Sequence, residues 1–202
     1  VKMIEYQEDP QGARLAMELV RGSSLRYYIL DRPALVADLF VQVCAGIGAL
    51  HAAGVAHRDV KPGNIMVENR KEILRPVLVD FGLATTSGEG PWEAAGTIEY
   101  VSPEVVAKAG TSTWEDLVRA DVYAASVTLF EILTGDVPFC GSPRDIQRQK
   151  TLRGEDLGYG VLRLDDPVGR VALRGIAPDP ADRFGTAAEM GEALAAARDL
   201  AD

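Results

Sequence analysis

The sequence predicts an α+β fold in which a few short strands precede a larger region of helices. Short apolar runs of strand length, bounded by Gly, Pro and Asp, occur before residue 80. Longer segments with apolar residues at three- or four-residue steps dominate the rest of the chain. Hydrophobic residues make up 47% of the 202 residues and charged residues 25%, which is typical of one or two globular domains and not of a disordered chain.

The N-terminal part should hold two strands and a long helix. Residues 1–6 and 15–20 are expected to form the strands, because a cluster of turn residues, Asp-Pro-Gln-Gly at 9–12, separates them. A helix is expected from Pro33 onward, with Gly54 as its C-terminal stop. The apolar residues of this helix follow the helical period: Leu35, Leu39, Val43, Ile47 and Leu50.

The middle of the chain should contain two further strands, a loop and a helix. Residues 65–67 and 77–79 are short apolar runs and are expected to form strands joined by a charged turn. Residues 83–100 are rich in Gly, Thr and Glu without a clear period, which predicts an exposed loop. Asp121 is placed as the N-cap of a mostly apolar helix that Gly135 ends. Because this helix carries few charges, we expect it to form the buried centre of the domain.

The last part of the chain is predicted to be helical. Weaker helical patterns cover residues 143–153 and 167–177. A final helix should follow Thr186, which begins a Thr-Ala-Ala-Glu capping-box sequence. Met190 and Leu194 then lie on the inward face of this helix.

Charge and cysteine content exclude several classes of protein. The chain has 21 Lys and Arg against 30 Asp and Glu, a net charge of −9, so it lacks the positive field that attracts nucleic acid or an anionic membrane. Cys44 and Cys140 lie far apart without metal-ligand spacing, which predicts reduced core thiols in a cytoplasmic protein. The most apolar stretch, residues 39–56, is interrupted by Gln, His and Gly, so no transmembrane helix is expected.

Three short motifs give the strongest functional signal. The sequence His-Arg-Asp-Val-Lys-Pro-Gly-Asn occupies residues 57–64, Asp-Phe-Gly follows at 80–82, and Ser-Pro-Glu at 102–104. Each motif alone is short enough to occur by chance. Their order and spacing together fix about nine residue types, at roughly one chance in twenty per position, which makes a coincidence negligible.

The residue types in these motifs suit phosphoryl transfer, which needs charge neutralisation and in-line positioning more than covalent catalysis. Asp59 is suited to orient an attacking hydroxyl and accept its proton. Lys61 can reach the transferring phosphoryl group as a point charge. Asn64 and Asp80 carry the hard oxygen atoms that Mg²⁺ prefers as ligands.

The same motifs resemble the catalytic loop, the magnesium-binding motif and the Ala-Pro-Glu segment of eukaryotic-like (bacterial-type) Ser/Thr protein kinases. The resemblance covers essentially the whole chain and implies an α+β, protein-kinase-like fold. Residues 1–20 would be a remnant of the small N-lobe, with two strands and the hinge, and residues 21–202 the mainly helical C-lobe. Lys61 two places after Asp59, together with Thr97, implies transfer to Ser and Thr hydroxyls rather than to Tyr.

The resemblance also implies a role for each matched residue, with ATP and Mg²⁺ as cofactors. The implied catalytic residues are Asp59, Lys61 and Asn64. The implied ATP-binding residues are Glu18, Val20, Lys61, Asn64, Met66 and Asp80, of which Asn64 and Asp80 would bind Mg²⁺. Regulatory roles are implied for Arg58, which would pair with a phosphate on the loop at 83–100, for Thr85 and Thr86 as candidate acceptors of that phosphate, and for Thr97. Structural roles are implied for His57, Phe81, Glu104, Asp121 and Arg183.

Three of these structural roles are specific enough to check. Glu104 and Arg183 are expected to form an ion pair within the large lobe, and breaking a buried pair costs on the order of 3–5 kcal/mol. The carboxylate of Asp121 is expected to hold the backbone of the His57 turn, in addition to capping its helix. Phe81 is expected to stack near His57.

Three nucleotide-binding parts of the family have no match in the sequence: the Gly-rich loop, the Lys of the third strand and the Glu that pairs with it. We therefore expect this chain to be a truncated kinase domain with little activity by itself. A non-catalytic kinase-like binding module is the alternative. A small-molecule phosphotransferase is a third possibility, disfavoured because the Ser-Pro-Glu segment and Arg183 shape a groove for protein substrates.

The expected partners follow from this interpretation. Protein substrates with Ser or Thr acceptors are expected and nucleic acid is not, and a kinase dimer is a further option. Contact with a membrane is expected only through a segment outside this chain. The expected location is the cytoplasm or, with such a segment, the cytoplasmic face of the membrane.

Overall fold

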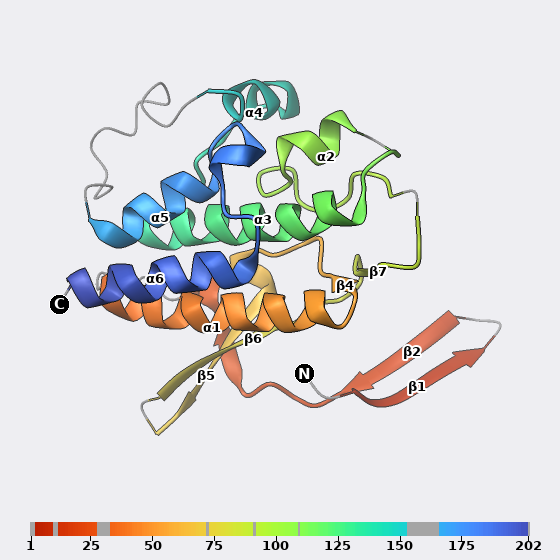
Figure 1. Ribbon diagram of the computed structural model, residues 1–202. Coiled ribbons are helices and arrows are strands. Elements are labelled where there is room, and N and C mark those ends of the chain that lie inside the picture. The colour runs from red at the N-terminus through yellow and green to blue at the C-terminus, as the bar shows by residue number, and fades with distance from the viewer. Residues whose placement is uncertain are drawn as a thin grey trace.

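A computed structural model describes residues 3–9, 12–27, 33–71, 73–90, 92–108, 110–152 and 166–201. The helices form the main body of the molecule, and three small sheets lie at its border (Figure 1). This arrangement confirms the α+β fold class that the sequence predicts. The sheets contain two, three and two strands and share no strand with one another.

The first sheet is a hairpin that extends away from the helices (Figure 1). It consists of β1 (Met3–Asp9) and β2 (Gly12–Met17), paired antiparallel with Asp9 opposite Gly12. Both strands reach into the turn cluster predicted at 9–12, and β2 ends at Met17, before the predicted end at residue 20. An isolated ribbon is exposed to solvent, so polar residues extend its strands as readily as apolar ones. Ile4 is accordingly 67% exposed.

The second sheet joins distant parts of the chain in the order β3-β5-β6. β3 (Gly22–Ser24) pairs antiparallel with β5 (Ile65–Arg70), which pairs antiparallel with β6 (Ile73–Leu78). The strands predicted at 65–67 and 77–79 are present, and both run further into the charged segment between them. Gly22 is needed in β3, because a Cβ atom there would lie 2.2 Å from the carbonyl oxygen of Val67.

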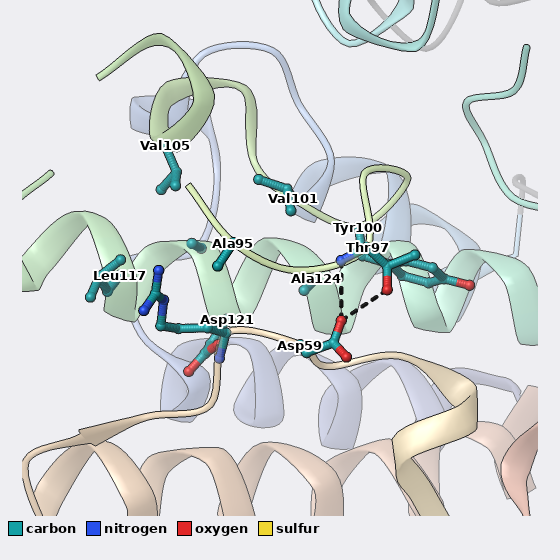
Figure 2. A pocket seen from close by; sticks show the side chains of 11 residues that line it. Asp59, Ala95, Thr97, Tyr100, Val101, Val105, Leu117, Asp121 and Ala124 are labelled. Atoms are coloured by element: carbon teal, nitrogen blue, oxygen red, sulfur yellow. Dashed lines mark hydrogen bonds between the residues drawn. The ribbon is translucent and has the colours of Figure 1, made fainter. Parts of the chain in front are cut away.

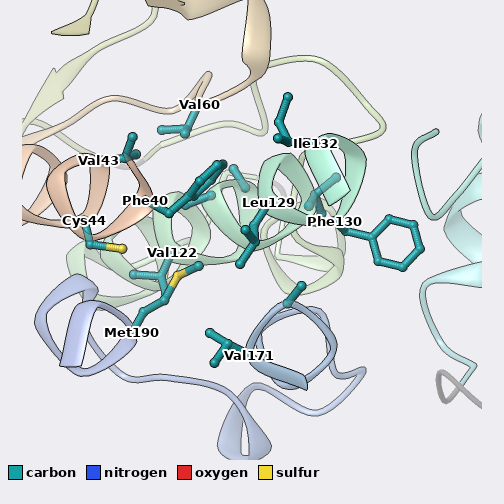
Figure 3. Close-up of a cluster of buried hydrophobic side chains, with 14 of the residues drawn as sticks. Phe40, Val43, Cys44, Val60, Val122, Leu129, Phe130, Ile132, Val171 and Met190 are labelled. Atoms are coloured by element: carbon teal, nitrogen blue, oxygen red, sulfur yellow. The ribbon is translucent and has the colours of Figure 1, made fainter. Parts of the chain in front are cut away.

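Four longer helices enclose the hydrophobic core: α1 (Pro33–Ala52), α3 (Trp114–Thr134), α5 (Pro167–Gly175) and α6 (Ala187–Ala201). α1 lies along α6, and α3 packs between α1 and α5 (Figure 1). Figure 3 shows the side chains of this core meeting between the helices, among them Phe40, Leu129 and Met190. Leu194 is also fully buried, so both inward residues predicted for the last helix are confirmed.

α1 is long and apolar enough to cross a membrane by length and composition alone. Its apolar side chains are instead used inside the domain, because Phe40, Val43 and Ile47 are buried in the same cluster as residues of α3 and α6. The predicted stop also holds. The helix ends at Ala52, and Gly54 follows with a φ of +71° that favours glycine.

The predicted start of the central helix is wrong. α3 begins at Trp114, where Thr113 is the N-cap and forms a reciprocal capping box with Asp116. Asp121 lies inside the helix and is 1% exposed. The first turns of α3 carry charged residues on their solvent side, such as Glu115, so the apolar pattern becomes visible only later in the helix.

Shorter elements complete the fold. α4 (Pro143–Gln149) and α5 end earlier than the segments predicted at 143–153 and 167–177. The other short elements are α2 (Pro103–Ala107), the paired strands β4 (Val55–Ala56) and β7 (Thr85–Thr86), and 3-10 turns at Leu25–Tyr27, Pro62–Asn64 and Pro180–Asp182. Cys44 is buried as predicted, but Cys140 is exposed, so its assignment to the core is wrong.

Candidate active site

The side chain of Asp59 is the centre of a compact polar cluster. It lies in the loop between β4 and the 3-10 turn at Pro62–Asn64, and only 8% of the residue is exposed. Lys61 donates from Nζ to Oδ2 over 2.7 Å, and Asn64 donates from Nδ2 to the same oxygen over 2.8 Å. The hydroxyl of Thr97 donates to Oδ1 over 3.0 Å. Three side chains that the sequence assigns to the site therefore meet on one carboxylate.

Thr97 reaches this cluster from a distant part of the chain. Figure 2 shows Asp59 pointing at Thr97, with contacts from both the backbone N–H and the hydroxyl. The hydroxyl also accepts a hydrogen bond of 2.7 Å from Nζ of Lys61. Thr97 thus bridges the acid and the cation of the cluster. The segment that follows Thr97 is thereby fixed next to Asp59.

These contacts set the charge of Asp59. Burial alone would raise the pKa of its carboxyl group. The hydrogen bonds from Lys61 and Thr97 and the nearby ammonium charge outweigh burial and hold this pKa below its ordinary value. Asp59 is therefore a carboxylate at neutral pH and an acceptor of hydrogen bonds.

Asp121 holds the backbone that carries Asp59. Its carboxylate accepts hydrogen bonds from the backbone N–H of His57 over 2.8 Å and of Arg58 over 2.7 Å. Arg58 has a φ of +67°, a conformation that non-glycine residues adopt only when their surroundings impose it. This anchor confirms the role that the resemblance implies for Asp121. A second contact was not expected: His51 in α1 lies with Nε2 at 2.9 Å from Oδ2 of the same carboxylate.

The Asp-Phe-Gly segment begins beside Asn64. The backbone N–H of Val79 donates to the carbonyl oxygen of Asn64 over 2.9 Å, and Asp80 is the next residue. The ring centroids of Phe81 and His57 lie 5.0 Å apart with the ring planes tilted by 49°, so Phe81 packs against His57 as predicted, at a tilt rather than face to face. Asp80 is exposed and has a φ of +63°. One of its carboxylate oxygens accepts from the backbone N–H of Gly82.

Asn64 and Asp80 fit a magnesium ion by the chemistry of their donors. The amide nitrogen of Asn64 is used by Asp59, which leaves the amide oxygen available. Asp80 likewise keeps one carboxylate oxygen that is not bonded to Gly82. The described part of the chain holds no cluster of three or more His, Cys, Asp or Glu that could bind a metal without help. Mg²⁺ does not need such a cluster, because it prefers one or two protein oxygens together with ligands from phosphates and water.

The residues predicted to contact adenine lie near the start of the second sheet. Glu18 is exposed and Val20 half-buried in the segment that leads from β2 to β3. Met66 is half-buried in β5 and pairs with Ser24 of β3. This pairing places Met66 next to the strand that follows Val20. Adenine contacts of these three residues stay a prediction.

The predicted regulatory residues separate into buried and exposed ones. Thr85 is buried, its hydroxyl donates to Glu89 over 2.7 Å, and Nε1 of Trp92 donates to it over 3.0 Å. Thr86 is exposed, so it is the more accessible acceptor of the two in this conformation. Arg58, the residue expected to pair with a phosphate, donates from Nη2 to the carbonyl oxygen of Glu93 in the same loop.

The predicted ion pair between Glu104 and Arg183 is present. Nη1 of Arg183 lies 2.9 and 3.0 Å from the two carboxylate oxygens of Glu104. Arg183 is 5% exposed and also donates to the carbonyl oxygens of Ala177 and Pro178. This pair ties α2, which follows the loop of Thr97, to the segment between α5 and α6.

Sequence reasoning missed one charged residue next to this loop. Lys150 is buried and donates to two backbone carbonyls of the segment that follows Thr97. No signal in the sequence marks it, because a lysine at the end of a short helix is ordinarily exposed.

Comparison with known proteins shows which family the chain resembles. The family model described as the protein kinase domain matches residues 1–166. The serine/threonine-protein kinase PknL of Mycobacterium tuberculosis (strain H37Rv) is 32% identical over 97% of this chain and 50% of PknL. The serine/threonine-protein kinase PrkC of Bacillus subtilis is 30% identical over 94% of this chain and 30% of PrkC. The chain thus spans half the length of PknL and less than a third of PrkC.

The fold has a counterpart among solved structures. A crystal structure of the Rad53 kinase domain superposes with a TM-score of 0.71 at 24% sequence identity, covering 93% of this chain and 67% of the other. This likeness shows the fold. Together with the family match over most of the sequence, it establishes that the chain belongs to the protein kinase domain family.

Proposed function

We propose that the protein containing this chain transfers the γ-phosphoryl group of ATP to Ser and Thr hydroxyls of protein substrates. The observation that carries this proposal is the cluster of Asp59 with Lys61, Asn64 and Thr97. It combines a charged acceptor for the attacking hydroxyl with a cation beside it. The names of the relatives, which are serine/threonine-protein kinases, support the substrate class.

Asp59 would act on the acceptor hydroxyl. Its carboxylate accepts a hydrogen bond from that hydroxyl and directs an oxygen lone pair toward the phosphorus atom. The new bond joins this oxygen to phosphorus while the bond from phosphorus to the bridging oxygen of ADP breaks. The hydroxyl proton passes to Asp59 and then to solvent. Because the pKa of Asp59 is low, its main contribution is to orient the hydroxyl, as suits a loose transition state.

Lys61, Asn64 and Asp80 would manage the negative charge. The ammonium group of Lys61 lies beside the position of the attacking hydroxyl, since it contacts both Asp59 and Thr97 at 2.7 Å. It can therefore neutralise charge on the phosphoryl oxygens. Asn64 and Asp80 would hold Mg²⁺, and Glu18, Val20 and Met66 would lie against adenine. When bound, Mg²⁺ shields the phosphate charges and aligns the leaving group.

We also propose that the 202 residues alone transfer phosphate much more slowly than the protein that contains them. The sequence holds no Gly-rich G-x-G-x-x-G segment after a strand and no Val-Ala-x-Lys. One preorganised electrostatic contact to the transition state is typically worth about 2.7–4 kcal/mol, so the absence of two would slow transfer on the order of 10⁴-fold or more. Expressing the full-length protein in place of these 202 residues should restore the rate of phosphate transfer.

Substitution of Asp59 in the full-length protein tests the proposed reaction. We expect Asp59→Asn to lower kcat for a generic Ser/Thr protein substrate by about 10²–10⁴-fold, since the carboxylate acceptor is removed. Asp38→Asn is the matched control, because Asp38 lies on the exposed face of α1 and its ion pair with Arg198 is solvated. ATP binding, measured by calorimetry, should be retained in both variants.

The outcomes separate the candidate functions. If Asp59→Asn transfers phosphate as fast as wild type, the role assigned to Asp59 is wrong. If the wild-type protein binds ATP but phosphorylates only small molecules, the protein-substrate class is wrong. If it neither binds ATP nor transfers phosphate, the alternative of a non-catalytic binding module takes its place.

A further inference from the structure

Lys150 is a charged residue in an apolar place. It follows α4 as its C-cap and is 1% exposed. Its Nζ atom donates to the carbonyl oxygens of Ile98 and Val101, each at 2.5 Å. The rings of Tyr123 and Phe139 lie 5.7 Å from the same atom. The ammonium group is thus surrounded by two carbonyls and two aromatic rings.

This burial requires an explanation, because removing an ammonium group from water is strongly unfavourable unless the protein compensates it. No ion pair in the described part of the chain includes Lys150. Burial lowers the pKa of Lys150 to about 8, although the carboxylates of Glu99 and Glu104 oppose this shift and Arg183 adds to it. The low pKa means that the surroundings do not fully replace water. An apolar side chain of the same length would be easier to bury.

The two carbonyls belong to the segment that starts at Thr97. Within it, the carbonyl oxygen of Thr97 accepts from the backbone N–H groups of Tyr100 and Val101, over 2.9 and 3.2 Å. The segment is therefore one tight turn. At its start, Thr97 contacts Asp59, and further along the turn Lys150 holds two of its carbonyls.

An acceptor hydroxyl that reaches Asp59 comes close to the start of this turn. The acceptor hydroxyl has to come within hydrogen-bond distance of Asp59, and Thr97 already contacts that carboxylate through its backbone and its hydroxyl. Substrate groups that reach Asp59 therefore lie next to Thr97 and the turn that begins there. The shape of this turn decides how well a substrate fits next to Asp59, and Lys150 holds that shape through its two hydrogen bonds to the turn.

We propose that Lys150 is a positioning residue for the protein substrate, which acts by holding the turn at residues 97–101 in its binding conformation. This inference rests on the proposed kinase function and names a residue that acts on the substrate side of the same site. Lys150 does not touch the reacting atoms. Its effect should therefore appear in substrate binding and not in the nucleotide site.

Lys150→Met in the full-length protein tests the proposal, because methionine keeps the length of the side chain and removes the charge. We expect the KM for a protein substrate to rise about tenfold or more, while the KM for ATP stays within about twofold. Lys108→Met is the matched control, since the Lys108 side chain is 48% exposed and pairs with Asp116 at the surface. It should change neither constant.

Thermal stability separates positioning from a purely structural role. The depressed pKa shows that the folded state disfavours the charged form relative to the unfolded state, so the charge of Lys150 opposes folding at pH 7. Methionine removes this unfavourable charge but also leaves the carbonyl oxygens of Ile98 and Val101 without their donor, so the two effects oppose each other and we expect the melting temperature of Lys150→Met to stay close to that of wild type. An unchanged substrate KM, or an increase that comes with a lower melting temperature and a higher KM for ATP, would overturn the proposal.

Hydrogen exchange tests whether Lys150 holds the turn at residues 97–101, without measuring activity. In wild type the amides of Tyr100 and Val101 are hydrogen-bonded within the turn, and we expect both to exchange faster in Lys150→Met but not in Lys108→Met. Equal exchange in wild type and Lys150→Met overturns the proposal. A wild-type protein that transfers no phosphate contradicts the proposed function instead, and the exchange measurement still decides whether Lys150 holds the turn.

Discussion

Thr97→Val removes one hydroxyl group from the centre of the candidate active site and leaves its shape nearly intact. In the native protein this hydroxyl donates to Oδ1 of Asp59 over 3.0 Å and accepts from Nζ of Lys61 over 2.7 Å. The variant keeps the weaker contact from the backbone N–H at 3.2 Å. Asp59 and Lys61 also remain in direct contact. The substitution therefore isolates the contribution of the bridging hydroxyl.

The magnitude follows from the charge that both partners of this hydroxyl carry. Hydrogen bonds to charged groups contribute about 1.5–3 kcal/mol each, so removing the bond to Asp59 should lower kcat/KM by roughly 10–150-fold. The hydroxyl also helps to keep the pKa of Asp59 low. Without it this pKa rises. Because Asp59 is proposed to act as a carboxylate, the acidic limb of the pH–rate profile should move to higher pH.

The assay is steady-state phosphorylation of a protein substrate by the full-length protein over a range of pH, for wild type, Thr97→Val and Thr97→Ser. Serine keeps the hydroxyl group, so Thr97→Ser should restore most of the rate and the original position of the acidic limb. The reasoning fails if Thr97→Val keeps half of the wild-type rate, or if Thr97→Ser loses as much activity as Thr97→Val.

Three further predictions concern stability and modification. Arg183→Met leaves the carboxylate of Glu104 without its partner, so we expect the free energy of unfolding to fall by about 3–5 kcal/mol. The melting temperature, measured by circular dichroism, should fall by roughly 6–20 °C. A decrease in unfolding free energy of less than about 1 kcal/mol contradicts this prediction. If the loop at 83–100 is phosphorylated, mass spectrometry should find the phosphate on Thr86 rather than on Thr85, because the hydroxyl of Thr85 is buried and hydrogen-bonded. Modification mainly at Thr85 would show that the loop opens before it reacts. Leu194→Ala empties a fully buried position and should lower the unfolding free energy by about 2–5 kcal/mol in urea titrations, whereas the same change at an exposed position of α6 should alter it by less than about 0.5 kcal/mol.

Much of the candidate site could be predicted because its residues are close in sequence. Asp59, Lys61 and Asn64 lie in one short loop, so the loop conformation alone brings them together. The long helices could be predicted equally well, since the period of their apolar residues shows directly which face is buried. The pairing of Glu104 with Arg183 required the family resemblance, because their separation of 79 residues leaves no local pattern.

The errors arise where a residue's role depends on a distant element. Asp121 fits an N-cap by type, but it lies inside α3; its second predicted role, holding the backbone of His57, came from the family resemblance and not from any local pattern. Thr85 is buried although it lies in a loop expected to be exposed, and its hydroxyl accepts a hydrogen bond from the indole of Trp92. Cys140 is exposed although cysteine is usually buried. Lys150 is buried although lysine rarely is, because tertiary packing overrides the average preference of a residue type.

The anchor at Asp121 has a consequence for the motions that the catalytic loop can undergo. Loops ordinarily open by small local fluctuations at low free energy. Here the amides of His57 and Arg58 are bonded to a side chain in the middle of α3, the helix around which the lobe is packed. Freeing them would leave the buried carboxylate of Asp121 without these two donors. These two loop amides should thus exchange more slowly than the amides of ordinary exposed loops, and the backbone that carries Asp59 should resist small local fluctuations.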